Sequence, residues 1–230
     1  MAKQSTYSKI VETFNQKSTM KQDVYDNTVQ SFKLMKRTAK ALVKKLNADP
    51  TLKDKRVVIE YTDRSNFEFG IRVSTDLLIF AMHTNVFTFD DGHLMNKSSY
   101  VKKDKTRSYC GIIHIYNFLN DSFKYNRLAD LGYLIGRMYV NKENHFFLEG
   151  KRQLGILFND FVHETISKEA VQEVIESAIL NCLNFDLYTP PFNSIRELSV
   201  QEMQSSNENI LAKTGKRLGF RFQSDTDEVE

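Results

Sequence analysis

The sequence predicts an α+β domain in which an antiparallel β-meander of about five to seven strands packs against an N-terminal helix and C-terminal helices. Three observations carry this prediction. Apolar residues recur at helical spacing from Asp23 onward, the pattern changes to a period of two over residues 56–90, and a helical period returns after Ser167. The order of helix, strands and helices is typical of the α+β class.

The length of 230 residues suits one large domain with appendages. We expect an N-terminal arm at residues 1–22, a single α+β domain at residues 23–191 and a polar extension at residues 192–230. Hydrophobic residues make up 41% of the chain and include 17 Phe, so wholesale disorder is excluded. The longest apolar run, residues 77–82, is much shorter than the roughly 20 residues of a membrane span. No membrane segment is therefore expected.

The compartment is predicted from the N-terminal segment and from the cysteines. The first ten residues, MAKQSTYSKI, lack the apolar core of a signal peptide. Two cysteines, Cys110 and Cys182, are too few for a disulfide framework or a four-thiolate zinc site. Both observations favour a cytoplasmic protein, and no metal site is predicted from cysteine spacing.

The first helix is predicted from apolar residues that recur every three or four positions between Val24 and Leu46. It ends before Pro50, because the residue that precedes a proline is pushed out of the helical region. Strands follow at residues 57–62, 67–73, 77–82 and 86–89, joined by connections too short for parallel crossovers. Asp91-Gly92 predicts a hairpin whose return strand begins at residues 94–95.

The middle of the chain is harder to assign. Residues 96–108 are charged and aperiodic, which indicates an exposed loop, and residues 109–116 form another strand. Residues 117–141 fit two structures. Leu128, Leu131, Leu134, Ile135 and Met138 have helical spacing, while residues 133–140 also suit a strand. We favour the helix, and place a short strand at residues 145–149.

Helices are predicted for the remainder of the domain. Apolar residues between Leu154 and Val162 indicate one, and Ser167 caps a second, amphipathic helix at residues 168–184. That helix suits a core or the interface of a homo-oligomer equally well. The sequence Thr189-Pro190-Pro191 ends the packed region, with a possible short helix at residues 195–203.

One candidate catalytic site is Asp130 together with Glu149 and Lys151, where an apolar run ends in Glu149-Gly150-Lys151. Two carboxylates and a lysine in the pattern D…ExK could bind Mg²⁺ and activate a water in a nuclease. The chemistry requires Asp130 on a strand beside Glu149, whereas the favoured interpretation puts Asp130 on a helix. The pattern is also short enough to occur by chance.

A candidate ligand surface lies in residues 115–127, IYNFLNDSFKYNR, where aromatic residues alternate with amides. Such a mixture suits stacking on bases or the lining of a polar pocket. The residues expected to contact a ligand are Asn117, Asp121, Tyr125, Asn126 and Arg127. The simpler alternative is that the aromatic residues belong to the core and the amides form turns.

A candidate nucleic-acid surface is the basic stretch of residues 31–56, which has nine basic and two acidic residues. Most of these side chains fall off the apolar stripe of the first helix, so a solvated helix face is the simpler explanation. If the partner is anionic, the residues expected to contact its phosphates are Lys36, Arg37, Lys40, Lys44, Lys102 and Lys103.

Other constellations have structural explanations. His83, Asp90, Asp91 and His93 surround a predicted turn, and Cys110 and His114 share a strand face with apolar residues. Glycine-rich phosphate loops and nucleophile elbows do not occur in the sequence. We therefore rank a non-catalytic ligand- or partner-binding module first, a metal-dependent nuclease second and a nucleic-acid-binding protein third.

Overall fold

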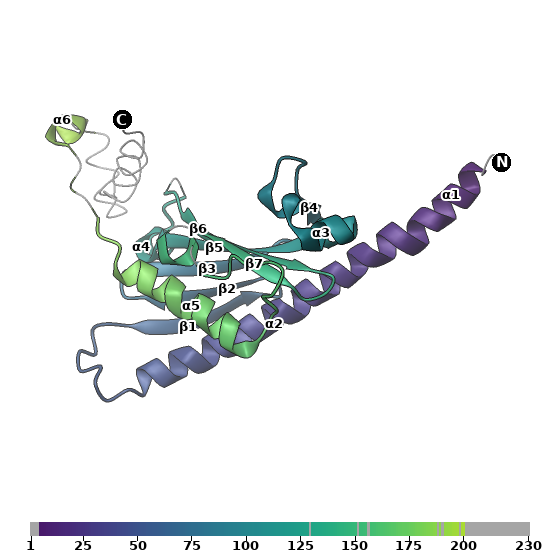
Figure 1. Ribbon diagram of the computed structural model, residues 1–230. Coiled ribbons are helices and arrows are strands. Elements are labelled where there is room, and N and C mark those ends of the chain that lie inside the picture. Colours follow the sequence, from purple (N-terminus) through teal and green to yellow (C-terminus); the bar gives the residue numbers. More distant parts are fainter. Residues whose placement is uncertain are drawn as a thin grey trace.

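The computed structural model describes residues 5–128, 130–150, 152–155, 157–187, 189, 191–197 and 199–200. Within these ranges the chain forms an antiparallel sheet with two long helices on one face (Figure 1). The α+β class and the antiparallel sheet are confirmed. Lys151 and most of the predicted extension, including the end of its short helix, lie outside the described residues. None of the described helices is both long enough and apolar enough to cross a membrane.

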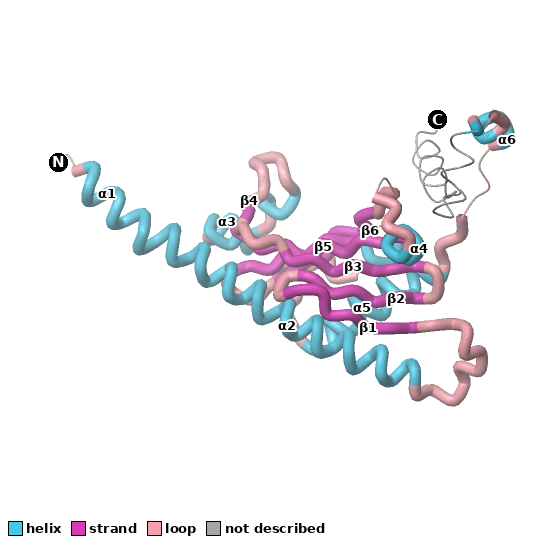
Figure 2. Tube along the Cα trace, turned by 180° about the vertical axis from the view of Figure 1, so that it is seen from behind, coloured by secondary structure: helices cyan, strands magenta, loops and turns pink. Residues whose placement is uncertain are grey.

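The N-terminal helix is longer than predicted. It comprises α1 (Thr6–Thr13), a π-helical turn η1 (Phe14–Ser18) and α2 (Thr19–Asn47), which follow one another without a break. The Ser5 hydroxyl caps it by accepting a hydrogen bond from the Ser8 amide. Residues 6–22 of the segment expected as an arm are therefore helical, and Figure 2 shows the N-terminal part of this helix projecting beyond the sheet.

Among the described residues the sheet has seven strands, and its main path is β1-β2-β3-β5-β6-β7. Neighbouring strands are antiparallel throughout, and the short strand β4 pairs with β5 off this path. The strands are β1 (Ile59–Ser65), β2 (Glu68–Val73), β3 (Asp76–Met82), β4 (Phe87–Thr88), β5 (Tyr109–Leu119), β6 (Tyr133–Asn141) and β7 (Phe146–Gly150).

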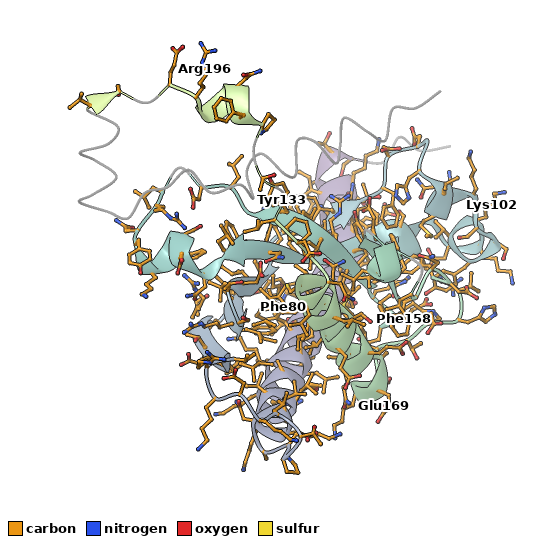
Figure 3. All side chains as sticks on the ribbon, turned by 90° about the vertical axis from the view of Figure 1, so that its left-hand side faces the viewer. Phe80, Lys102, Tyr133, Phe158, Glu169 and Arg196 are labelled. Carbon is orange, nitrogen blue, oxygen red and sulfur yellow. The ribbon has the colours of Figure 1, made fainter. Side chains whose placement is uncertain are left out.

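One face of the sheet carries the main core. Alternate residues of the strands, such as Phe69, Phe80 and Ile113, are fully buried against α2 and α5 (Lys168–Leu183). Figure 3 shows Phe80 between the sheet and the helices. The Ser167 hydroxyl accepts a hydrogen bond from the Ala170 amide, so the predicted N-cap of α5 is present. The apolar side of α5 is used in this core.

The opposite face carries a second, smaller core at one end. A second cluster there joins Tyr100 and Val101 to Ile112, Tyr139 and Phe147 of the sheet. Tyr100 and Val101 belong to α3 (Ser99–Lys103), which stands between the 3₁₀ turns η2 (Leu94–Lys97) and η3 (Lys105–Ser108). The exposed loop predicted at residues 96–108 is thus wrong, because a five-residue helix is too short to show periodicity in the sequence.

The predicted hairpin at Asp91-Gly92 is also wrong. These two residues form a turn, but the chain continues into η2 instead of a return strand. The strand β4 finds its partner in β5, where Phe87 lies opposite Cys110. Long-range pairing therefore replaces the local pairing that the turn signal predicts.

The helix favoured within residues 117–141 is wrong as well. The chain there completes β5, forms the short helix α4 (Asn120–Lys124) and returns as β6. The end of β6 is buried on both faces, so its apolar residues do not alternate. A bulge at Ile135 shifts the alternation further. These two irregularities imitate helical spacing.

The helix predicted between Leu154 and Val162 does not form. A 3₁₀ turn, η4 (Arg152–Gly155), is followed by irregular chain in which Phe158 has a positive φ of 49°. This chain runs beside β7, because the carbonyl oxygens of Phe158 and Glu164 accept hydrogen bonds from the Leu148 and Phe146 amides. The segment satisfies backbone donors at the edge of the sheet. The last described helix is α6 (Phe192–Ile195).

Candidate nucleic-acid interface

Five cationic side chains lie along one flank of α2. Each of Lys33, Lys36, Arg37, Lys40 and Lys44 lies three or four residues from another member of the set, and Lys36 and Arg37 are adjacent, so all five fall on one side of the helix. Met35, Ala39 and Leu42 of the same helix point into the core. All of the five cations except Lys36 are exposed. The sequence prediction named four of them and missed Lys33, which the same spacing identifies.

This flank forms one wall of a trough whose other wall is the hairpin of β1 and β2. Two adjoining hollows, of about 590 and 400 Å³, share Gln30, Lys33 and Lys36 in their linings. The first hollow is lined in addition by Tyr25, Asp26, Val29, Asn66 and Phe67, and the second by Arg37, Lys40, Tyr61 and Asp63. From Tyr25 to Lys40 is 15 residues, or about 22 Å at 1.5 Å per residue.

Lys36 connects the two walls. Its Nζ lies 2.7 Å from an Asp63 carboxylate oxygen and also donates a hydrogen bond to the Ser65 carbonyl oxygen. The same ammonium stands 5.6 Å from the centroid of the Phe32 ring, and its side chain is 15% exposed. Lys36 therefore holds β1 against α2 and is not available to a phosphate in this arrangement, which differs from its predicted role.

The other cations of the trough retain their charge uncompensated. Within the part of the chain that the structure describes, Lys33, Arg37 and Lys40 form no ion pair. The lining also contains two carboxylates: Asp63 pairs with Lys36, and Asp26 accepts a hydrogen bond from the neutral Gln22 side-chain amide at 3.0 Å. The four cations of the lining outnumber these two carboxylates. The trough thus presents net positive charge to an incoming ligand.

Aromatic side chains lie beside these cations. Phe67, at the turn between β1 and β2, is 37% exposed, and Tyr61 and Tyr25 are half-buried. Burial, together with the Asp63 carboxylate, raises the pKa of Tyr61 to about 12, so its phenol is neutral at physiological pH. Rings next to cations and to the amides of Gln30 and Asn66 are the components of surfaces that stack bases and hold phosphates. Sequence spacing alone could not place these rings here.

The predicted lysines Lys102 and Lys103 are not part of this trough. They are exposed at the end of α3, which packs on the opposite face of the sheet, and Lys102 lies at the periphery of the molecule (Figure 3). The six predicted phosphate contacts therefore divide into one group on α2 and a separate pair on α3.

The segment of aromatic and amide residues does not gather into one surface. Asn117 is buried within β5 opposite Tyr133, while Asp121 lies in the first turn of α4 and is exposed. The Lys124 ammonium lies 4.8 Å from the centroid of the Tyr125 ring. Asn126 has a positive φ of 50°, which suits its use in the turn after α4.

Arg127 pairs with Asp130 at 3.2 Å, with a side chain that is 6% exposed. The five predicted ligand contacts are thus distributed over a strand, a short helix and a turn. Most of their amides and charges serve local structure.

The residues of the nuclease hypothesis have separate partners. Asp130 lies in the connection between α4 and β6, where it accepts a hydrogen bond from the Ser122 hydroxyl at 2.6 Å. Glu149 lies on β7 and accepts hydrogen bonds from Arg137 at 2.6 Å and from the Tyr139 hydroxyl at 3.0 Å. Burial opposes the effect, but these hydrogen bonds hold the pKa of Glu149 below its usual value. Asp130 does not occupy the strand that this chemistry requires.

The histidine and cysteine candidates lie in packed or local surroundings. The described residues contain no group of three or more His, Cys, Asp or Glu side chains that could hold a metal ion. His93 stacks on Phe89 with ring centroids 4.4 Å apart, and His83 lies against Phe87. Cys110 is buried, which raises the pKa of its thiol, and burial also lowers the pKa of His114. A nucleophilic pair of these two residues is therefore disfavoured.

Comparison of the chain with known protein families, with curated proteins and with solved structures found no match.

Proposed function

We propose that this protein is a non-catalytic binding module whose ligand is single-stranded nucleic acid, held in the trough between α2 and the hairpin of β1 and β2. The observation that carries the proposal is the uncompensated charge of Lys33, Arg37 and Lys40 beside the exposed ring of Phe67. Cations that follow a backbone, together with rings on which bases stack, are the recurring features of such surfaces.

The shape of the site favours a single strand over a duplex. The cationic flank of α2 is one wall of the trough and faces the hairpin of β1 and β2, so it does not stand alone as a ridge that could enter a major groove about 12 Å wide. An unpaired strand can lay its phosphates along Lys33, Arg37, Lys40 and Lys44 and turn a base toward Phe67. Lys36 maintains the width of the trough through its contact with Asp63.

The proposal predicts a particular dependence on salt. Four phosphate contacts on a single strand give a logarithmic slope of affinity against salt of about −2.8, which is four times −0.7. Replacing Lys33 and Lys40 with Gln is expected to reduce its magnitude by about 1.4. Fluorescence anisotropy at a series of salt concentrations measures the slope. The probe is an oligothymidylate of about 20 nucleotides, because common single-strand sites cover about 4–16 nucleotides.

The matched control is the double substitution Lys102→Gln and Lys103→Gln, which removes the same charge from α3. We expect this control to leave both affinity and slope unchanged. Equal losses in the two double variants would show that binding follows net charge and not the trough. A duplex of the same length bound as tightly as the single strand would refute the choice of ligand.

Base stacking is tested separately. Phe67→Ala is expected to weaken binding of the oligonucleotide by about 1–3 kcal/mol without changing the salt slope, because stacking involves no counterion release. Phe123→Ala, at an exposed ring elsewhere on the surface, is the control. Unchanged affinity in Phe67→Ala would remove that ring from the proposed site.

A further inference from the structure

The projecting part of the N-terminal helix carries an exposed apolar stripe. Tyr7 is 77% exposed, Ile10 49%, Val11 40% and Phe14 65%. None of the residues of α1 is buried, and Met20 is the first buried residue along the described helix. Spacing of three, four and seven residues places the four side chains on one side of α1. Figures 1 and 2 both show this part extending away from the sheet.

The π-helical turn separates this stripe from the core-facing stripe of α2. A π-turn contains about one residue more than an α-turn, which rotates everything that precedes it by about 100° around the helix axis. The apolar side of α1 is therefore not a continuation of the side on which Val24 contacts the core. Without the extra residue the two stripes would be closer in phase.

The stripe is complementary to itself. About the midpoint between Ile10 and Val11, a two-fold axis would place Tyr7 against Phe14 of a second copy and Ile10 against Val11 of that copy. Rings then meet rings and β-branched side chains meet each other, as an isologous contact requires. The charged residues of α1, Lys9 and Glu12, lie on the other side of the helix by their angular position, so like charges do not meet.

We propose that the protein forms a weak, reversible homodimer through an antiparallel pair of α1 helices. The apolar area of the stripe limits the affinity of this dimer. Two rings of about 150–250 Å² each, largely exposed, supply most of the apolar surface in each copy. The total is less than the roughly 1,200 Å² of standard stable interfaces, which places the contact among transient ones. This self-association is independent of the proposed nucleic-acid binding.

Sedimentation velocity of the full chain over a range of concentrations tests the proposal. We expect a monomer–dimer equilibrium with a dissociation constant in the micromolar range, and at least a tenfold weakening in Phe14→Glu. Lys9→Glu changes charge on the opposite side of α1 and is expected to leave the constant unchanged. Because α1 has no buried residues, thermal unfolding of both variants should match that of the parent chain.

Orientation is tested by mixing chains that carry Tyr7→Cys with chains that carry Phe14→Cys under mild oxidation. The antiparallel arrangement predicts the mixed disulfide, whereas a parallel pair would give the two like-with-like products. A chain that remains monomeric at all concentrations would overturn the proposal. This holds also if the chain is monomeric because another of its own segments covers the stripe. Equal weakening by Phe14→Glu and Lys9→Glu would overturn it too.

Discussion

Lys36 of α2 and Asp63 of β1 form an ion pair of 2.7 Å that joins the long helix to the edge strand of the sheet. The pair is asymmetric, because the Lys36 side chain is 15% exposed and that of Asp63 is 61% exposed. The second hydrogen bond of Lys36, to the Ser65 carbonyl oxygen, fixes the ammonium at the same place. A cation on a basic helix flank thus serves the fold, while its neighbours face solvent.

Lys36→Met is therefore expected to lower the free energy of unfolding by only about 1 kcal/mol, because solvent around the exposed Asp63 carboxylate screens the ion pair. The methionine retains the aliphatic contact with Phe32. Urea denaturation measures the change, and Lys33→Met serves as the control because Lys33 is exposed and forms no ion pair in the described chain. Equal destabilisation by both substitutions would contradict the role assigned to Lys36.

Gly111 is expected to tolerate no side chain. A Cβ at this position of β5 would lie 2.0 Å from Thr28 Oγ1 and 2.7 Å from Thr28 Cβ, since α2 crosses the sheet there. Gly111→Ala should lower the free energy of unfolding by about 1–3 kcal/mol, the usual effect of overpacking. Gly92→Ala is the control, because its nearest neighbour would be Asp90 Oδ1 at 3.4 Å. A thermal midpoint unchanged in Gly111→Ala would disprove this close approach.

Asp104 makes stability depend on pH. Hydrogen bonds from Lys142 and Thr106 hold the pKa of Asp104 far below its usual value. A folded-state pKa below the unfolded value of about 3.9 stabilises the fold above that pH, and the contribution is lost as the pH falls toward the folded value. The side chain is 36% exposed, so the effect is limited to about 1 kcal/mol at low salt.

Asp104→Asn is expected to flatten the fall in unfolding free energy between about pH 4 and pH 2. Denaturant titrations at a series of pH values measure it, and Asp91→Asn, at an exposed turn, provides the comparison. The Asp104 ion pair would be judged irrelevant if both variants followed the pH profile of the parent chain.

The two thiols are expected to be unreactive in the folded protein. Cys110 and Cys182 are 1% and 2% exposed, and burial raises the pKa of the Cys110 thiol. A thiol-specific chromogenic reagent at mildly alkaline pH should detect neither cysteine rapidly in the native chain and both after denaturation, because the thiolate is the reacting form. Rapid reaction of either thiol in the native chain would show that the fold opens locally around that cysteine.

Elements with a long uniform pattern could be predicted from the sequence. The residues between Val24 and Leu46 and those after Ser167 have helical spacing over several turns, and the structure contains α2 and α5 there. The strands β2 and β3 also follow from their composition and short connection. Each of the two helices buries one consistent side, so the sequence records its period.

Elements shaped by distant partners could not be predicted. The strand β6 has a bulge at Ile135 and is held by β5 and β7, and the chain near Phe158 is irregular, with its carbonyl oxygen bonded to β7. In both segments the spacing of apolar residues reflects burial from two directions. The spacing of apolar residues in such a segment has no single period, so neither helix nor strand can be assigned from it.

The candidate site divides in the same way. Helical spacing in the sequence by itself determined that Arg37, Lys40 and Lys44 share one flank of a helix. Only the tertiary structure decided that Lys36 turns toward Asp63 and that Tyr61 and Phe67 face the remaining cations. The physical reason is that helix periodicity is a local property of the backbone, whereas the opposite wall of the trough depends on how β1 docks against α2.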